Sequence, residues 1–188
     1  MIKIGIPGSL ASGKSTASKF LSGKRGPLFS ADSAVKELYK NSKFKSLIIK
    51  KFKIKNNNQI KKNLKKIIFN NSAELKKLEK MIHPLVRKKM KKFTIKNKNK
   101  KILFYEIPLL IESKLMKYFD KIIFIKSKKQ LRLKRFNSKN GDKKLFNLLN
   151  SKQMRDSKKI KFCDYVVVNE KNLKILKKDL STIISKYE

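Results

Sequence analysis

The residues best suited to chemistry lie in one short stretch near the start of the chain. Gly8 to Ser15 reads Gly-Ser-Leu-Ala-Ser-Gly-Lys-Ser, which matches the phosphate-binding pattern G-x-x-x-x-G-K-[ST] in full. An apolar strand precedes the stretch in the expected fold and a helix follows it, as the phosphate-binding motif requires. This context argues against a chance match in a chain rich in lysine and serine. The stretch therefore predicts a phosphate-binding loop.

The chemistry of such a loop assigns a role to most of its residues. Backbone N–H groups turn toward the phosphates of a nucleotide, and the N-terminus of the following helix adds partial positive charge. We expect Lys14 to bridge the β- and γ-phosphates and the hydroxyl of Ser15 to coordinate Mg²⁺. The predicted ATP-binding residues of the loop are Gly8, Ser9, Leu10, Ala11, Ser12, Gly13, Lys14, Ser15 and Thr16.

Two carboxylates follow apolar runs of the chain and are candidate site residues. Glu106 directly follows the run Ile102–Tyr105, and Asp32 comes shortly after the run Pro27–Phe29. Because the carboxyl ends of parallel strands face the ligand crevice, Glu106 can support a metal ion indirectly, and Asp32 can accept the proton of a hydroxyl that attacks the γ-phosphate. Each has a structural alternative that these residues leave open: Glu106 can simply end a strand at the surface, and Asp32 can cap a helix.

The apolar pattern predicts the sheet that positions these residues. Five short runs, several rich in β-branched and aromatic residues, are bounded by turn signals and separated by helical patterns. This alternation predicts an α/β fold with a doubly wound parallel sheet of about five strands. The runs are Ile2–Ile6, Pro27–Phe29, Ile102–Tyr105, Ile122–Ile125 and Tyr165–Val168.

Two long connections interrupt this alternation. Helical periodicity extends from about Phe44 to Phe93, which is too long for a simple crossover and indicates a helical insert. A polar, basic stretch from about Lys128 to Lys161 separates the fourth and fifth runs. We therefore expect residues 1–188 to form a single domain, with a core over about 1–40, 100–127 and 162–188, an insert over about 41–99 and a basic segment over about 128–161.

The composition narrows the class of protein. Lysine and arginine total 51 against 13 acidic residues, so the formal net charge is +38. Such a charge attracts polyanions, but lysine, asparagine and isoleucine share A/T-rich codons, and a base-composition bias explains their joint excess better than a nucleic-acid role. The single cysteine, Cys163, excludes an internal disulfide. No apolar run approaches the length of a membrane span, and the chain enters a strand pattern at once, so we expect a cytoplasmic protein.

Several separated motifs resemble one enzyme family. The phosphate-binding loop is followed, in order, by Ser30-Ala31-Asp32, by His83-Pro84-Leu85-Val86 and by Pro108-Leu109-Leu110-Ile111-Glu112. In this order and spacing they resemble dephospho-CoA kinase, and the likeness covers nearly the whole chain. The loop alone is shared by many enzymes, whereas the His-Pro and P-L-L-x-E elements are much more specific.

The resemblance implies a nucleoside-kinase-like P-loop fold in which the insert binds CoA and the basic segment forms a lid. ATP, with Mg²⁺, would phosphorylate the ribose 3′-hydroxyl of dephospho-CoA, giving CoA and ADP. On this resemblance Asp32 falls on the family's catalytic aspartate, and Lys14 and Ser15 fall on its loop residues. His83 falls on a substrate-side histidine, Arg135 matches a lid arginine, and Pro108 and Leu109 would shape the pocket wall, with core packing as their alternative role.

The chain also departs from the family pattern. The family usually has glycine where this chain has Ser9 and Ala11, which leaves the loop less backbone freedom. In the lid, Lys139 and Lys159 replace arginines, and Arg155 is displaced by one position. Arginine holds phosphate in a bidentate fork whereas lysine acts as a point charge, so these replacements put individual ATP contacts of the lid in doubt.

Two other functions compete with this one. A P-loop kinase for a nucleoside monophosphate would tend to carry a dense arginine clamp, but the first half of the chain has only Arg25 and Arg87. A basic nucleic-acid-binding protein would place aromatic residues on an exposed platform, but this chain has no tryptophan, and phenylalanines such as Phe52 and Phe104 fall on periodic apolar positions. We therefore expect a small-molecule substrate, no specific nucleic acid, no membrane, and a monomer or weak homo-oligomer.

Overall fold

The computed structural model divides into two compact units. Residues 1–30 and 96–188 form the first, here called the sheet unit, and Ala31–Ile95 form the second, here called the helical unit. The structure describes residues 1–23, 25–54, 59–69 and 71–188.

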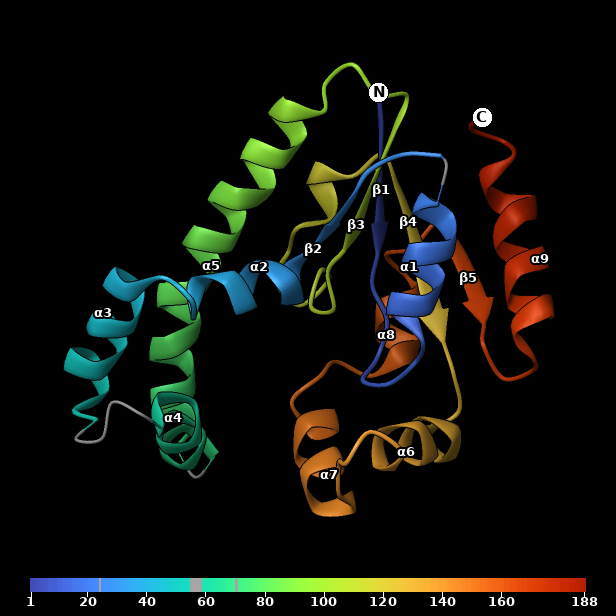
Figure 1. The fold of residues 1–188 in the computed structure, drawn as a ribbon. Coiled ribbons are helices and arrows are strands. Elements are labelled where there is room, and N and C mark those ends of the chain that lie inside the picture. The colour runs from blue at the N-terminus through green and yellow to red at the C-terminus, as the bar shows by residue number, and fades with distance from the viewer. Residues whose placement is uncertain (24, 55–58, 70) are drawn as a thin grey trace. The chain divides into compact units, whose positions relative to one another are not determined.

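The sheet unit is built on five parallel strands in the order β2-β3-β1-β4-β5 (Figure 1). The predicted parallel sheet is thereby confirmed, with the second strand displaced by one residue from the apolar run that predicted it. The strands are β1 (Ile2–Ile6), β2 (Leu28–Ser30), β3 (Ile102–Glu106), β4 (Lys121–Lys126) and β5 (Tyr165–Val168).

The strands form where they do because a parallel sheet covered on both faces needs nearly continuous apolar runs. All five residues of β3 are buried. Along β1 the side chains alternate between faces: Ile4 and Ile6 join the core beneath the helices, while a Cβ added at Gly5 would lie 2.6 Å from the Leu110 side chain. The segment after β3 therefore packs directly on the opposite face of the central strand.

Helices α1 (Lys14–Ser22) and α9 (Leu173–Ile184) cover one face of the sheet (Figure 1). Their apolar residues share one core with β1, β3, β4 and β5. Helix α9 begins where a polar side chain accepts from a free backbone N–H group: Asn172 Oδ1 accepts from the N–H of Ile175. The core residues are Ile4, Ile6, Ala17, Leu21, Ile102, Phe104, Ile123, Ile125, Val167, Leu176, Leu180 and Ile184.

The basic segment between β4 and β5 is helical. It contains α6 (Lys129–Asn137), α7 (Lys143–Ser151) and α8 (Asp156–Ile160). Phe146 of α7 is fully buried and its ring lies 5.7 Å from that of Phe136 on α6, so aromatic packing joins these two helices. A short 3₁₀ helix, η2 (Met116–Tyr118), precedes β4.

The helical unit has a core of its own. Its helices are α2 (Ala31–Leu38), α3 (Ser42–Phe52), α4 (Ile60–Phe69) and α5 (Ser72–Lys96). Helix α5 continues through Pro84, whose ring lacks the N–H that would bond to the carbonyl four residues earlier. No helix in the described ranges is both long and apolar enough to span a bilayer. The buried core residues are Leu38, Phe44, Ile48, Phe52, Ile54, Leu64 and Leu78.

Candidate active site

The predicted phosphate-binding loop connects β1 to α1 at the carboxyl edge of the sheet. Gly13 is the N-cap residue of α1, so the helix begins directly at Lys14. At the other end of the loop, the N–H of Ile125 donates to Pro7 O (3.0 Å), and a Cβ added at Gly8 would lie 2.6 Å from Ile125 O. Gly8 is therefore required because β4 passes against the loop too closely for any side chain.

Gly13 is required for two reasons. Its φ of +96° lies in the left-handed region, and a Cβ at this position would lie 2.1 Å from Asn169 Nδ2. Asn169 cannot simply turn away, since its amide donates to Ser12 O (2.9 Å) and the side chain is buried. Asn169, which directly follows β5, thus holds the loop at Ser12 and Gly13, where α1 begins.

We expect Gly13→Ala to lower the free energy of unfolding by about 2–3 kcal/mol, because alanine is strained at this φ and displaces the Asn169 hydrogen bond. Urea unfolding followed by circular dichroism would measure the change. A Gly13→Ala/Asn169→Ala double variant should relieve the clash but keep the backbone strain. A single variant as stable as the wild type would contradict the arrangement described.

Lys14 is held inside the loop. The residue is only 8% exposed, and its Nζ donates to Ser9 O (2.9 Å) across the loop. The N–H of Ser12 also donates to Ser9 O (3.1 Å), so the loop is closed by contacts to one carbonyl. Ala11 adopts a φ of +58°, a conformation that glycine takes at less cost. One of the two departures from the family's glycines therefore falls where glycine would relieve strain.

Ser15 of the loop and Glu106 of β3 form a hydrogen-bonded pair. The Ser15 hydroxyl donates to Glu106 Oε1 (2.5 Å), and Glu106, 5% exposed, ends β3 beside Ile6 of β1 and Ser30 of β2. In the described part of the chain, no three His, Cys, Asp or Glu side chains gather to hold a metal ion. A hydroxyl with a carboxylate behind it fits Mg²⁺, which prefers oxygen ligands and takes most of its remaining ligands from phosphate and water.

Three side chains from the segment between β4 and β5 contact the loop. Arg132 Nη1 donates to Leu10 O (3.3 Å), and the N–H of Leu10 donates to Gln153 Oε1 (3.0 Å). Ser9 Oγ donates to Asp156 Oδ1. Burial lowers the pKa of the Arg132 guanidinium, and the charge of Asp156 opposes that effect. The middle of the loop is therefore held by α6, α8 and the turn before α8.

The lid cations named from the sequence lie in different surroundings. Arg135 is fixed by contacts to Ser127 Oγ (3.2 Å) and Asn169 O (3.0 Å), while Lys139 and Arg155 are exposed. Lys159 is fully buried and pairs with Glu112 Oε1 at 2.7 Å. Lys159 therefore forms an ion pair inside the protein. The family usually has arginine at this position, and the lysine found here does not alter the cations on the surface of the lid.

The remaining predicted residues divide between the two units. Asp32 is the second residue of α2 and His83 lies in α5, both in the helical unit; Asp32 is exposed and His83 half-buried. Pro108 and Leu109 are half-buried and lie in the sheet unit, one residue beyond the end of β3. Their roles as base, substrate contact and pocket wall stay predictions.

Comparison with known proteins decides the family. A family model described as dephospho-CoA kinase matches residues 2–174. The chain belongs to the dephospho-CoA kinase family. A dephospho-CoA kinase from Bartonella quintana is 37% identical over 186 residues, covering 96% of this chain and 95% of the relative.

Solved structures agree with the fold of this dephospho-CoA kinase family member. A dephospho-CoA kinase from Campylobacter jejuni superimposes with a TM-score of 0.65 at 26% identity, covering 99% of this chain and 97% of that one. A Thermus thermophilus protein superimposes with a TM-score of 0.84 at 22% identity over 100% and 98% of the two chains, a likeness of fold. The predicted P-loop kinase fold is confirmed.

Some site residues of this dephospho-CoA kinase family member were not predicted from the sequence. Asn169 directly follows β5, and its position at the carboxyl end of a parallel strand is a signal that points to the site edge. Arg132 and Asp156 had no comparable signal, because both lie in a segment crowded with lysines where spacing alone does not show which side chain turns toward the loop.

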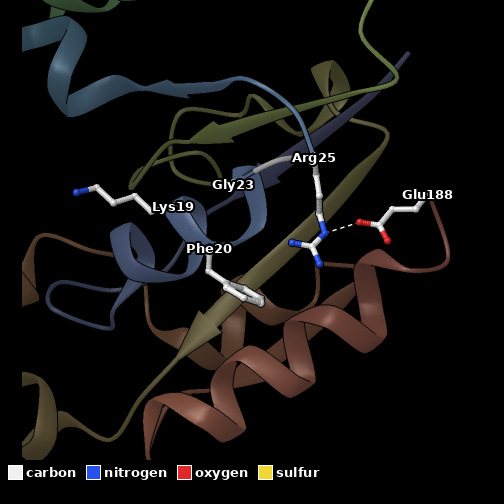
Figure 2. A pocket seen from close by; sticks show the side chains of 5 residues that line it. All are labelled: Lys19, Phe20, Gly23, Arg25 and Glu188. Carbon is white, nitrogen blue, oxygen red and sulfur yellow. Dashed lines mark hydrogen bonds and ion pairs between the residues drawn. The ribbon is translucent and has the colours of Figure 1, made fainter.

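A separate hollow lies at the opposite end of α1. Its volume is about 580 Å³, and Figure 2 shows the side chains that line it, with an ion pair between Arg25 and the C-terminal Glu188. Helix α1 has nine residues, which puts its two ends about 13 Å apart. The hollow is therefore distinct from the phosphate-binding loop. Its lining residues are Lys19, Phe20, Gly23, Arg25 and Glu188.

The single cysteine is not a nucleophile. Burial, followed by the nearby charge of Asp164, raises the pKa of the Cys163 thiol to about 12. Because the pKa is raised, the thiol stays neutral up to well above pH 9, and only the thiolate reacts. We expect iodoacetamide at pH 8 to label the native protein far more slowly than the urea-unfolded protein, as measured by mass spectrometry. Equal labelling rates would show that the native thiol is accessible and acidic.

Proposed function

We propose that the protein transfers the γ-phosphoryl group of ATP to the ribose 3′-hydroxyl of dephospho-CoA, giving CoA and ADP, the final step of coenzyme A synthesis. The observation that carries the proposal is the phosphate-binding loop, with Lys14 at the start of α1 and the Ser15–Glu106 pair beside it, in a member of the dephospho-CoA kinase family. This geometry suits phosphoryl transfer, in which the protein mainly positions and stabilises charge.

The loop residues Gly8–Thr16 would bind the phosphates of ATP. Backbone N–H groups and the N-terminus of α1 favour the negative charge there. Lys14, held by Ser9 O before ATP binds, would exchange that carbonyl for the β- and γ-phosphate oxygens. Arg135, fixed beside the loop by Ser127 and Asn169, would add a guanidinium to the same phosphates.

Ser15 would hold Mg²⁺ through its hydroxyl, and Glu106 would act behind it by accepting a hydrogen bond. The ion, when bound, neutralises the charge that develops on the phosphate oxygens. Glu106 would in addition fix the rotamer of Ser15, because its carboxylate accepts a hydrogen bond from the Ser15 hydroxyl.

The residues proposed for the acceptor are Asp32, His83, Pro108 and Leu109. Asp32 would accept the proton of the attacking 3′-hydroxyl, a role supported by its position as the second residue of α2, which follows β2, and by the resemblance of Ser30-Ala31-Asp32 to the family's D-A-D element. His83 would bind the acceptor, and Pro108 and Leu109 would form part of the pocket wall. The helices of residues 41–99 would bind the CoA moiety, and the segment of residues 128–161 would act as the lid.

The experiment that tests this function is a coupled assay of ADP release with Mg²⁺ and ATP. Dephospho-CoA, AMP, CMP, adenosine and water alone would be offered as acceptors in parallel. ADP formed with dephospho-CoA, with the product identified as CoA by mass spectrometry, is the expected result. Preference for AMP or CMP would show a nucleoside monophosphate kinase instead. Turnover with no acceptor would contradict the proposal.

We propose that the reaction requires Mg²⁺. Omission of Mg²⁺ should abolish turnover, and restoring it should recover the rate. We also propose that the enzyme acts in the cytoplasm, as a monomer or weak homo-oligomer, without a specific nucleic acid. Light scattering would measure the mass in solution. A salt titration would show whether binding to duplex DNA is purely electrostatic.

A further inference from the structure

The side chain of Ser9 forms a hydrogen bond between the phosphate-binding loop and the lid segment. It is 2% exposed, and its hydroxyl donates to Asp156 Oδ1 at the start of α8. The two residues are 147 positions apart in sequence. A glycine, the residue usual in the family at this position, has no side chain with which to make such a contact.

Asp156 can act as a fixed acceptor because α8 is anchored elsewhere. Lys159, one turn further along α8, is fully buried and pairs with Glu112 Oε1 at 2.7 Å. The same oxygen accepts from the N–H of Met154, just before α8 (3.2 Å). Helix α8 is thus tied to the segment after β3 at one point and to the phosphate-binding loop at another.

The contact falls on the part of the loop that most needs support. Leu10, next to Ser9, is held on both backbone groups, its N–H by Gln153 and its carbonyl by Arg132. Ala11 then takes a φ of +58°, which a non-glycine residue adopts only at a cost in energy. Ser9 O also accepts from Lys14 Nζ, so a displacement of Ser9 would move the partner of the phosphate-binding lysine.

We propose that Ser9 and Asp156 are positioning residues for ATP: their hydrogen bond fixes residues 9–11 of the loop in the conformation that receives the phosphates. A hydrogen bond to a carboxylate is stronger than one between neutral groups, and this one holds the loop two residues before Ala11, where the backbone is strained. The inference deepens the proposed function, on which it rests for the identity of ATP as ligand.

The test is a double-mutant cycle read by ATP binding without any acceptor. Calorimetry would give Kd for ATP with the wild type, Ser9→Ala, Asp156→Ala and the double variant. We expect each single variant to weaken ATP binding about tenfold, and the double variant to be no weaker than the singles, because both changes remove the same contact. KM for ATP should rise in parallel while kcat stays within about twofold of the wild type.

Matched variants separate positioning from general damage. Ser18→Ala removes a buried hydroxyl from α1 that has no hydrogen-bond partner within the described ranges, and Asp142→Ala removes a lid carboxylate that caps α7. Both should leave Kd for ATP unchanged. Asp156→Asn keeps an oxygen that can accept the Ser9 hydrogen bond, so it should recover most of the ATP affinity that Asp156→Ala loses. If the negative charge of Asp156 mattered only for the stability of the fold, Asp156→Asn would not restore ATP binding.

The outcomes are distinct. Wild-type affinity in Ser9→Ala, or strictly additive losses in the double variant, would overturn the inference. Tighter ATP binding in Asp156→Ala would also overturn it, by showing that the carboxylate obstructs the phosphates. A wild type that binds ATP but phosphorylates none of the acceptors would defeat the proposed function alone, since the binding cycle would still decide the role of Ser9 and Asp156.

Discussion

Lys14→Ala is expected to lower kcat by about a thousandfold, with the fold retained. The ammonium group is the only cation that the structure places inside the loop itself, and charge that develops on the transferring phosphoryl group is stabilised most strongly in such a partly dehydrated place. The side chain contributes little to the core, so its loss should be felt in the transition state far more than in folding. Steady-state kinetics at saturating ATP would measure the effect.

Lys19→Ala is the matched control for this prediction. It removes the same group from the same helix, but the side chain is exposed near the far end of α1. We expect it to leave kcat unchanged, which would exclude a general effect of reduced positive charge in a chain of net charge +38. A Lys14→Ala enzyme with more than a tenth of the wild-type kcat would contradict the role assigned to Lys14.

Asp32→Asn is expected to lower kcat by about 10²–10⁴-fold while changing KM for ATP little. An amide keeps the size and the hydrogen-bonding capacity of the side chain but cannot accept the proton of the attacking hydroxyl. Because the loop residues that bind ATP remain intact, the loss should fall on the chemical step. Single-turnover kinetics with dephospho-CoA would separate that step from product release.

Glu37→Gln is the control for Asp32→Asn. Both carboxylates are exposed and lie on α2, but Glu37 pairs with Lys89 of α5, and its hydrogen bond with Lys89 lowers its pKa. The change should leave kcat near the wild-type value. If Asp32→Asn also retained full activity, Asp32 would be no more than a helix-terminal residue, which is the alternative that the sequence left open.

Much of the fold could be predicted because its strands are buried on both faces. The clearest case is β3, whose five residues are all buried, so Ile102–Glu106 stands out against the lysine-rich remainder of the chain. β5 has exposed positions at Val166 and Val168, but its run of β-branched residues still predicts a strand. The uninterrupted helix through Pro84 could not be predicted in the same way. A proline inside a helical pattern normally marks a boundary, and only the packing of the helical unit shows that α5 continues past it.

The site could be predicted in part for a similar reason. The roles of Lys14 and Ser15 follow from a local motif, in which a few neighbouring residues define the geometry. Contacts such as Ser9–Asp156 and Gly13–Asn169 join residues about 150 positions apart, and no local pattern encodes which of many polar side chains will meet. Gly13 belongs to the local motif, but the contact of its neighbour Ser12 with Asn169 is visible only in the three-dimensional arrangement.

The position of β1 in the middle of the sheet has a consequence for folding during synthesis. β1 precedes both of its partners in the chain: it pairs with β3 in a register that joins Ile2 to Ile102, and with β4, which comes after β3. Closing a loop of this length is slow, because its entropic cost must be met before the pairing contributes any stability. The helical unit between them draws its core from residues close in sequence. We expect pulse-labelled hydrogen exchange to show protection first in α3 and α5, and only later in β1, so β1 of the nascent chain stays unpaired until β3 has been made.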